Sequence, residues 1–189
     1  EIDEDVREKF LESLSAKQIA ESIEKMDSDD ATDLLQDLPE KKQEAVLSEI
    51  KDETQTSDIT DLLNYDEDSA GGIMDKEFIA ANVNWTVKNA LELLRKQVED
   101  VDQIYTIYVT DNNSNLLGTL SLKKFLYASE STLIKDIYRK DPIHVQALVP
   151  SEEVASIMEK YELVVVPVIN EVGALIGRIT IDDAMEVIK

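Results

Sequence analysis

Apolar residues in the first third of the chain recur about every twelve residues, each followed by Ser, Asp or Pro. Three consecutive segments show this pattern, at residues 14–23, 26–35 and 38–47. Ser15 and Asp27 are typical residues at the start of a helix, and Pro39 suits a first helical turn. The spacing predicts amphipathic helices of about two turns each. Such short helices are unstable alone, so we expect them to stack as a helical array over residues 1–66.

Residues 67–189 alternate extended and helical patterns instead. The first set predicts extended segments at 78–83, 104–110 and 116–120, with helices at 87–95 and 122–127. The same order returns 59 residues later, where Gly177–Thr180 aligns with Gly118–Ser121. This second set predicts extended segments at 143–145, 164–169 and 174–179, with helices at 152–161, after a cap at Ser151, and 182–188. The duplication predicts two similar subdomains packed together.

Acidic residues greatly outnumber basic ones. The chain has 41 Asp and Glu against 19 Lys and Arg, a formal charge of −22. Residues 1–66 hold 21 acids and 7 bases, and residues 67–189 hold 20 and 12, so both parts are negative. This balance argues against nucleic acid as a partner, because phosphate contacts need clustered Lys and Arg. One explanation of the acidic excess is that it keeps the protein soluble. The other is that the acidic residues bind hard divalent cations, which prefer oxygen ligands.

The sequence also argues against an enzyme. It contains no cysteine, which removes disulfides and thiolate chemistry, and its single histidine, His144, would have to serve any Ser-His-Asp triad. No nucleophile constellation or cofactor loop is present. No stretch approaches the roughly 18 apolar residues of a membrane span. The chain begins with Glu1 and stops at Lys189 after a helical pattern, so we expect it to be a piece of a longer protein.

The duplicated unit resembles a pair of CBS modules. Residues 177–183, Gly-Arg-Ile-Thr-Ile-Asp-Asp, match the G-x-x-[ST]-x-x-D signature that ends many such modules. In that family the hydroxyl and the carboxylate can hold the ribose of an adenine nucleotide, which implies Thr180 and Asp183 as nucleotide-binding residues here. The first module departs from the signature, because Lys124 stands where the acid would be.

The segment between the two parts is more specific. Residues 65–74, Tyr-Asp-Glu-Asp-Ser-Ala-Gly-Gly-Ile-Met, closely resemble the Y-x-E-D-x-A-G-G-x-M segment that opens the CBS pair of MgtE-type magnesium transporters. The resemblance covers essentially the whole chain. It implies an α+β multidomain protein, with an all-α superhelical N domain of short helices at 1–66 and α/β CBS modules at 67–134 and 135–189. It further implies a homodimer through the CBS modules at the cytoplasmic face of the cell membrane, with a membrane pore domain following Lys189.

That family also implies a function. Mg²⁺ ions screen the repulsion between acidic faces of the N domain and the CBS pair, and the compact state closes the pore. The family's sensing acids fall on six residues of this sequence: Asp29, Asp33, Glu152, Glu162, Asp183 and Glu186. Each of these acids could instead have a role without a metal. Asp29 and Glu152 could stabilise the positive end of a helix dipole, and Asp183 and Glu186 could belong to an ordinary solvated helix face. The alternative function is a CBS-pair sensor of adenine nucleotides, ATP or AMP, which would use Thr180 and Asp183.

Overall fold

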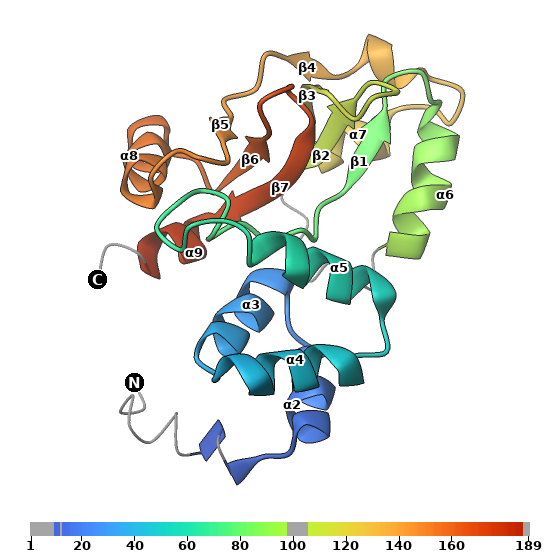
Figure 1. The fold of residues 1–189 in the computed structure, drawn as a ribbon. Helices are drawn as coiled ribbons and strands as arrows, with labels where there is room; N and C mark the ends of the chain where they lie inside the picture. Colours follow the sequence, from blue (N-terminus) through green and yellow to red (C-terminus); the bar gives the residue numbers. More distant parts are fainter. Residues whose placement is uncertain (1–9, 12, 98–105, 187–189) are drawn as a thin grey trace. The chain divides into compact units, whose positions relative to one another are not determined.

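The computed structural model describes residues 10–11, 13–97 and 106–186 and divides the chain into two compact units, Glu1–Asp66 and Glu67–Lys189 (Figure 1). The first unit is helical within its described residues, and the second combines helices with two small sheets. The α+β architecture expected from the sequence is therefore confirmed.

Short helices form the first unit. They are α2 (Ala16–Ile23), α3 (Ser28–Gln36), α4 (Glu40–Glu49) and α5 (Glu53–Leu62). Helix α2 packs against α4, and α3 packs against α5. Each helix contributes to one core, in which Ile23, Leu35, Val46 and Ile59 are fully buried. The helices are too short to be stable alone, so this shared apolar core holds the unit together.

The predicted helix starts are confirmed at two positions and shifted at a third. Ser15 and Gln18 form a capping box ahead of α2, and Asp27 is the N-cap of α3. Pro39 was expected in the first turn of α4, but it is the N-cap residue and the helix begins at Glu40. The fixed φ of proline is compatible with both positions, so the sequence alone could not separate them.

The first module of the second unit is a four-stranded sheet in the order β1-β2-β3-β4. Strand β1 is parallel to β2, and the other neighbours are antiparallel. Its elements are β1 (Ala80–Asn82), α6 (Val87–Gln97), β2 (Ile107–Thr110), β3 (Leu116–Leu120), α7 (Leu122–Tyr127), the 3₁₀ helix η1 (Ile134–Asp136) and β4 (Arg139–Lys140). The core includes Ile107, Leu120, Phe125 and Ile134. Residues 104 and 105 of the predicted second strand lie outside the described residues.

The second module repeats the design in the order β5-β6-β7. Its elements are β5 (Val145–Gln146), α8 (Ser151–Tyr161), β6 (Val165–Ile169), β7 (Leu175–Thr180) and α9 (Ile181–Glu186). Ser151 was expected to cap α8, but Pro150 is the N-cap and Ser151 is the first helical residue. The Ser151 N–H instead donates to the carbonyl of Asp68 at 2.8 Å. The last residues of the predicted final helix, 187 and 188, lie outside the described residues.

The tips of the two β-hairpins join the modules. Leu116 N–H donates to the Gly173 carbonyl at 3.0 Å, and Leu175 N–H donates to the Ser114 carbonyl at 2.9 Å. The first tip is held by Asp111, whose side chain accepts from the Asn115 side chain. That hydrogen bond, followed by those from backbone N–H groups, lowers the pKa of Asp111. Backbone pairing therefore fixes the two modules to each other at this end.

The sheet of each module is also completed by a segment that falls within the bounds expected for the other module. In the first module, β4 pairs with β3, Gly118 opposite Lys140. In the second, Asp75 forms an antiparallel bridge to Arg178 of β7, although Asp75 lies ahead of β1, within the bounds expected for the first module. Upstream, Ala70 and Gly71 N–H groups donate to the carbonyls of Val149 and Ala147 at 2.7 and 2.8 Å. We call residues 68–75 the linker; it is bound along the second module.

Glycine permits both crossings, which gives a stability prediction. A Cβ at Gly118 would collide with the backbone carbonyl of Arg139 and come within 2.5 Å of the Tyr138 ring, whereas at Gly177 its nearest neighbour would be the Met74 sulfur at 2.5 Å. Overpacking destabilises by about 1–3 kcal/mol. At Gly177 the Cβ would also come within 2.9 Å of the Asp75 carbonyl, a milder backbone clash than the one with Arg139. We expect Gly118→Ala to reach the upper end of that range and Gly177→Ala to lose less, because its closest contact is a methionine side chain, which can move. Urea unfolding measures both; equal losses, or the reverse order, would contradict the packing argument.

Candidate functional site

Thr180 and Asp183 form a hydrogen-bonded box at the start of α9. The Thr180 hydroxyl and N–H donate to Oδ2 of Asp183 at 2.6 and 2.9 Å, and the Asp183 N–H points back to the Thr180 hydroxyl at 3.5 Å. This reciprocal pattern is a helix capping box. The two residues predicted to bind nucleotide are thus in direct contact, and their signature has a structural role as well.

Asp75 and Arg178 form a buried ion pair beside this box. Arg178 Nε lies 3.0 and 3.2 Å from the two carboxylate oxygens of Asp75, and the two side chains are only 6% and 4% exposed. Their backbones exchange two hydrogen bonds, of 2.9 and 3.0 Å. Sequence reasoning missed this pair, because the residues are 103 positions apart. The one available signal was a charged residue inside a strand pattern, since a buried arginine needs a partner.

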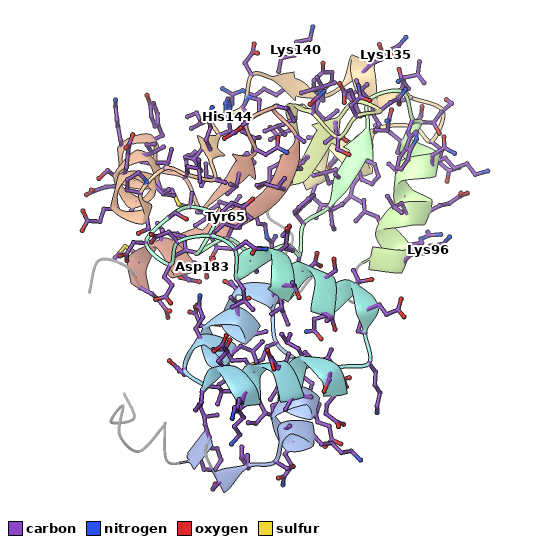
Figure 2. All side chains as sticks on the ribbon, viewed as in Figure 1. Tyr65, Lys96, Lys135, Lys140, His144 and Asp183 are labelled. Carbon is purple, nitrogen blue, oxygen red and sulfur yellow. The ribbon has the colours of Figure 1, made fainter. Side chains whose placement is uncertain are left out.

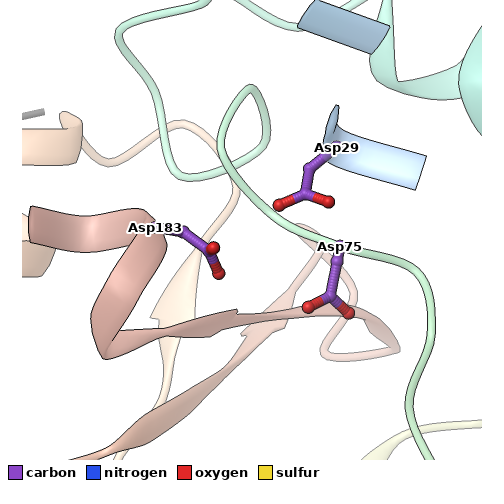
Figure 3. A group of neighbouring side chains, drawn as sticks. All are labelled: Asp29, Asp75 and Asp183. Carbon is purple, nitrogen blue, oxygen red and sulfur yellow. The ribbon is translucent and has the colours of Figure 1, made fainter. Parts of the chain in front are cut away.

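Two carboxylates of the second unit meet at this point. One oxygen of Asp75 and one of Asp183 lie within 4.8 Å of each other. Figure 3 shows both side chains, Asp183 on the first turn of α9 and Asp75 on the linker. The buried Tyr108 hydroxyl has no hydrogen-bond partner among the described residues, and the charges of Arg178 and Asp75 act on it. Burial raises the Tyr108 pKa most, Arg178 opposes that rise and Asp75 adds to it.

The other acids predicted in the second unit lie at other positions of α8 and α9. Glu152 is exposed in the first turn of α8, and Glu162 is the C-cap residue at its far end. With a rise of about 1.5 Å per residue, the helix keeps these two backbones roughly 15 Å apart, so they cannot hold one ion together. Glu186 is exposed on α9, one turn after Asp183, and α9 packs against α8.

Glu162 has a strained backbone. Its φ of 52° and ψ of 44° are left-handed, a conformation that glycine adopts most easily. Position 162 ends α8 before Leu163, whose N–H donates to the Met158 carbonyl at 2.9 Å. A glutamate here is less stable than glycine would be.

The two predicted acids of the first unit lie on α3. Asp29 is half-buried in the first turn and Asp33 is exposed one turn later, so the four-residue spacing puts both on one helix face. Both make further interactions through their side chains or backbone. Figure 3 labels Asp29 on its helix. The predicted sharing of a face is thus met for this pair.

The equivalent place in the first module lacks the carboxylate. Ser121 caps α7 by accepting from the Lys124 N–H at 3.2 Å, but the exposed Lys124 side chain cannot return an acceptor. His144 is exposed, and its Nδ1 lies 2.9 Å from the Pro142 carbonyl (Figure 2). Because that carbonyl can only accept, Nδ1 carries the proton. This contact is with backbone rather than with the carboxylate that a triad histidine needs.

Comparisons with known proteins identify the architecture. The MgtE intracellular N domain family matches residues 1–68, and the CBS domain family matches residues 70–131 and 134–189. The chain belongs to the MgtE family. The magnesium transporter MgtE of Thermus thermophilus is 35% identical over 143 residues, which are 76% of this chain and 32% of that protein. This confirms the resemblance expected from residues 65–74.

Solved structures agree with the family. The soluble part of a magnesium transporter has a TM-score of 0.87 and 31% identity, covering 96% of this chain and 71% of that one. The cytosolic domain of the Mg²⁺ channel MgtE in complex with ATP has a TM-score of 0.88 and 32% identity, covering 98% and 76%. The chain spans about a third of the length of the curated relatives it matches. Within the described ranges, none of the helices has both the length and the apolarity needed to cross a bilayer.

The capping box gives a second stability prediction. Thr180→Ala removes the hydroxyl that caps α9 and should destabilise the chain by about 1 kcal/mol. Asp183→Asn keeps an oxygen acceptor for the Thr180 donors and should lose less than half of that. Ser121→Ala, which removes the matching cap of α7, is the control and should resemble Thr180→Ala. Urea unfolding decides: an unchanged Thr180→Ala midpoint would show that the box does not cap.

Proposed function

We propose that this chain is the cytosolic Mg²⁺-sensing region of a magnesium channel or transporter. The observation that carries the proposal is the match of the whole chain, N domain and CBS pair in order, to MgtE relatives named as magnesium transporters. The role is regulatory rather than catalytic. The pore domain would follow Lys189, and this region would lie at the cytoplasmic face of the cell membrane.

Electrostatics supplies the mechanism. Both units are negative, so they repel each other, and a divalent cation between acidic faces reduces that repulsion. Mg²⁺ usually keeps several waters and takes one or two carboxylates, so weak sites shared by separate faces suit it. Asp29 and Asp33 would act from the first unit, and Glu152, Glu162, Asp183 and Glu186 from the second. When Mg²⁺ is abundant the two units draw together, and this compact state closes the pore.

Dimerisation through the CBS modules is part of the same proposal. Large apolar side chains are exposed on three helices of the second unit: Leu126 and Tyr127 on α7, Tyr161 on α8 and Met185 on α9. Tyr127 is 85% exposed. Apolar side chains that are exposed in one contiguous patch are typical of surfaces that a partner covers. A second copy of this chain would bury them and would hold two sensing regions next to one pore.

A titration of the 189-residue chain with Mg²⁺ tests the proposal. At constant ionic strength, Mg²⁺ should reduce the scattering radius and protect residues near 66–68 from protease, because the units approach. The Mg²⁺ midpoint of the Asp29→Asn/Asp183→Asn variant should be at least roughly fivefold higher, since each change removes the negative charge of a proposed ligand. Size-exclusion chromatography with light scattering reports the dimer in the same samples.

A matched control separates local sites from total charge. Asp30→Asn/Asp182→Asn removes two charges at the adjacent, exposed positions. Its Mg²⁺ midpoint should stay within about twofold of the unmodified chain, because adjacent positions on a helix do not face the same side. A chain that neither compacts nor gains protection up to tens of millimolar Mg²⁺ would exclude the sensing function.

Adenine-nucleotide sensing is the second candidate. Two observations favour it: the contact between Thr180 and Asp183, and the ATP complex of the structurally similar MgtE cytosolic domain. The paired hydroxyl and carboxylate could together contact ribose hydroxyls, as their family signature implies. Such binding would modulate the attached protein and does not exclude Mg²⁺ sensing.

Calorimetry with ATP, ADP and AMP tests this candidate. If the second module binds nucleotide, Thr180→Ala/Asp183→Asn should abolish the heat of binding. Ser121→Ala in the first module serves as the control for lost helix capping and should bind as the unmodified chain does. Heat that persists in the double variant would place the nucleotide elsewhere.

A further inference from the structure

Arg178 is a fixed positive charge inside the carboxylate cluster of the second unit. The residue is 5% exposed, and its Nε contacts both oxygens of Asp75. A guanidinium stays charged at every physiological pH, so this position always carries a cation. An ion pair buried to this degree interacts much more strongly than one at the surface, because solvent screens it less.

Asp183 lies within range of this charge. One of its oxygens is within 4.8 Å of an Asp75 oxygen, and Asp75 is in contact with Arg178. These separations are shorter than the screening length of ~10 Å at 0.1 M salt. Arg178 is also only two positions before Thr180, whose N–H and hydroxyl hold Asp183. The cluster thus contains two acids and one resident base.

The resident base changes what the acids can bind. Without it, two carboxylates less than 5 Å apart would repel each other and attract a divalent cation strongly. With it, the net formal charge of these three groups is −1 instead of −2. A hydrated Mg²⁺ approaching Asp183 therefore meets weaker attraction than the acids alone would give.

We propose that Arg178 is an affinity-setting residue, a built-in cation that raises the Mg²⁺ concentration at which Asp183 takes up the ion. Asp75 is its counterpart, because it holds the guanidinium in place and cancels part of its charge. The proposal rests on the Mg²⁺-sensing function. It assigns the response threshold to the charge balance of Asp75 and Arg178, in addition to the carboxylates that contact the ion.

The Thr180 amide offers a readout local to this cluster. Its N–H donates to Oδ2 of Asp183, so a cation at Asp183 should shift the ¹⁵N–¹H resonance of Thr180. We would titrate Mg²⁺ into the ¹⁵N-labelled 189-residue chain at constant ionic strength. The midpoint of the Thr180 shift then measures uptake at Asp183 without any transport assay.

Two substitutions should move this midpoint in opposite directions. Arg178→Gln removes the resident cation and should lower the midpoint roughly tenfold. Asp75→Asn removes the negative charge that partly cancels that of Arg178, so it should raise the midpoint severalfold. A merely structural pair would shift both midpoints the same way, since either change loosens the linker. Asp182→Asn, an exposed neighbour, is the control and should change the midpoint less than twofold.

Each outcome decides the proposal. Unchanged midpoints, or shifts of the same sign, overturn it while leaving Mg²⁺ sensing intact. If Mg²⁺ does not shift the Thr180 resonance of the unmodified chain, Mg²⁺ sensing at Asp183 is excluded. The proposal for Arg178 then still requires that Mg²⁺ shift this resonance in Arg178→Gln, and it is overturned if no shift appears there. If Arg178→Gln does not fold, Asp75→Asn decides, because asparagine keeps an oxygen acceptor for Nε; its midpoint must rise.

Discussion

The second unit depends on the pairing of the linker with the second module. Strand β7 is the last strand of its sheet, and an uncovered edge exposes unpaired backbone groups. The linker covers part of that edge through two backbone hydrogen bonds between Asp75 and Arg178, and Gly177 lets Met74 lie directly against the strand. Because the linker leads into the first module, that module cannot move away without exposing the edge and leaving a buried ion pair unmatched. The chain arriving from the helical unit is therefore anchored first to the second module.

Local sequence features predicted most of what local interactions determine. Ser15 and Asp27 were predicted as helix starts and are the N-caps of α2 and α3. Thr180 and Asp183, which the signature singled out together, are in contact three positions apart. Errors arose where a distant segment decides. Ser151 was expected as a cap, but its N–H is engaged by the Asp68 carbonyl and Pro150 takes the cap position. The pairing of Asp75 with Arg178 left no periodic signal, because it joins segments that are separated by the whole first module.

The same reasoning explains an asymmetry between the modules. Both place a hydroxyl residue before their last α-helix, Ser121 before α7 and Thr180 before α9. Only in the second does a carboxylate return the hydrogen bond, so Asp183 is held in a fixed orientation by two donors. A carboxylate that is already oriented loses less conformational entropy when it binds a ligand than a mobile one does. Structural capping and ligand binding are thus compatible uses of Asp183. The Lys124 side chain can do neither, because an ammonium group has no acceptor.

Total charge and local charge would have different consequences for the Mg²⁺ sensing proposed above. The formal charge of −22 creates a broad repulsive field, but most of the carboxylates among the described residues are exposed and are screened by salt within ~10 Å. A threshold for an ion must therefore be set where charges are close together and shielded from solvent. Asp75, Arg178 and Asp183 meet that condition in the second unit, since the pair is nearly inaccessible and the third charge is its neighbour. In the role proposed for Arg178, a fixed arginine there would tune affinity through its charge alone, without changing the oxygen ligands or their geometry. Such tuning suits Mg²⁺, because an ion that keeps most of its hydration shell is selected more by local potential than by a tight protein cage.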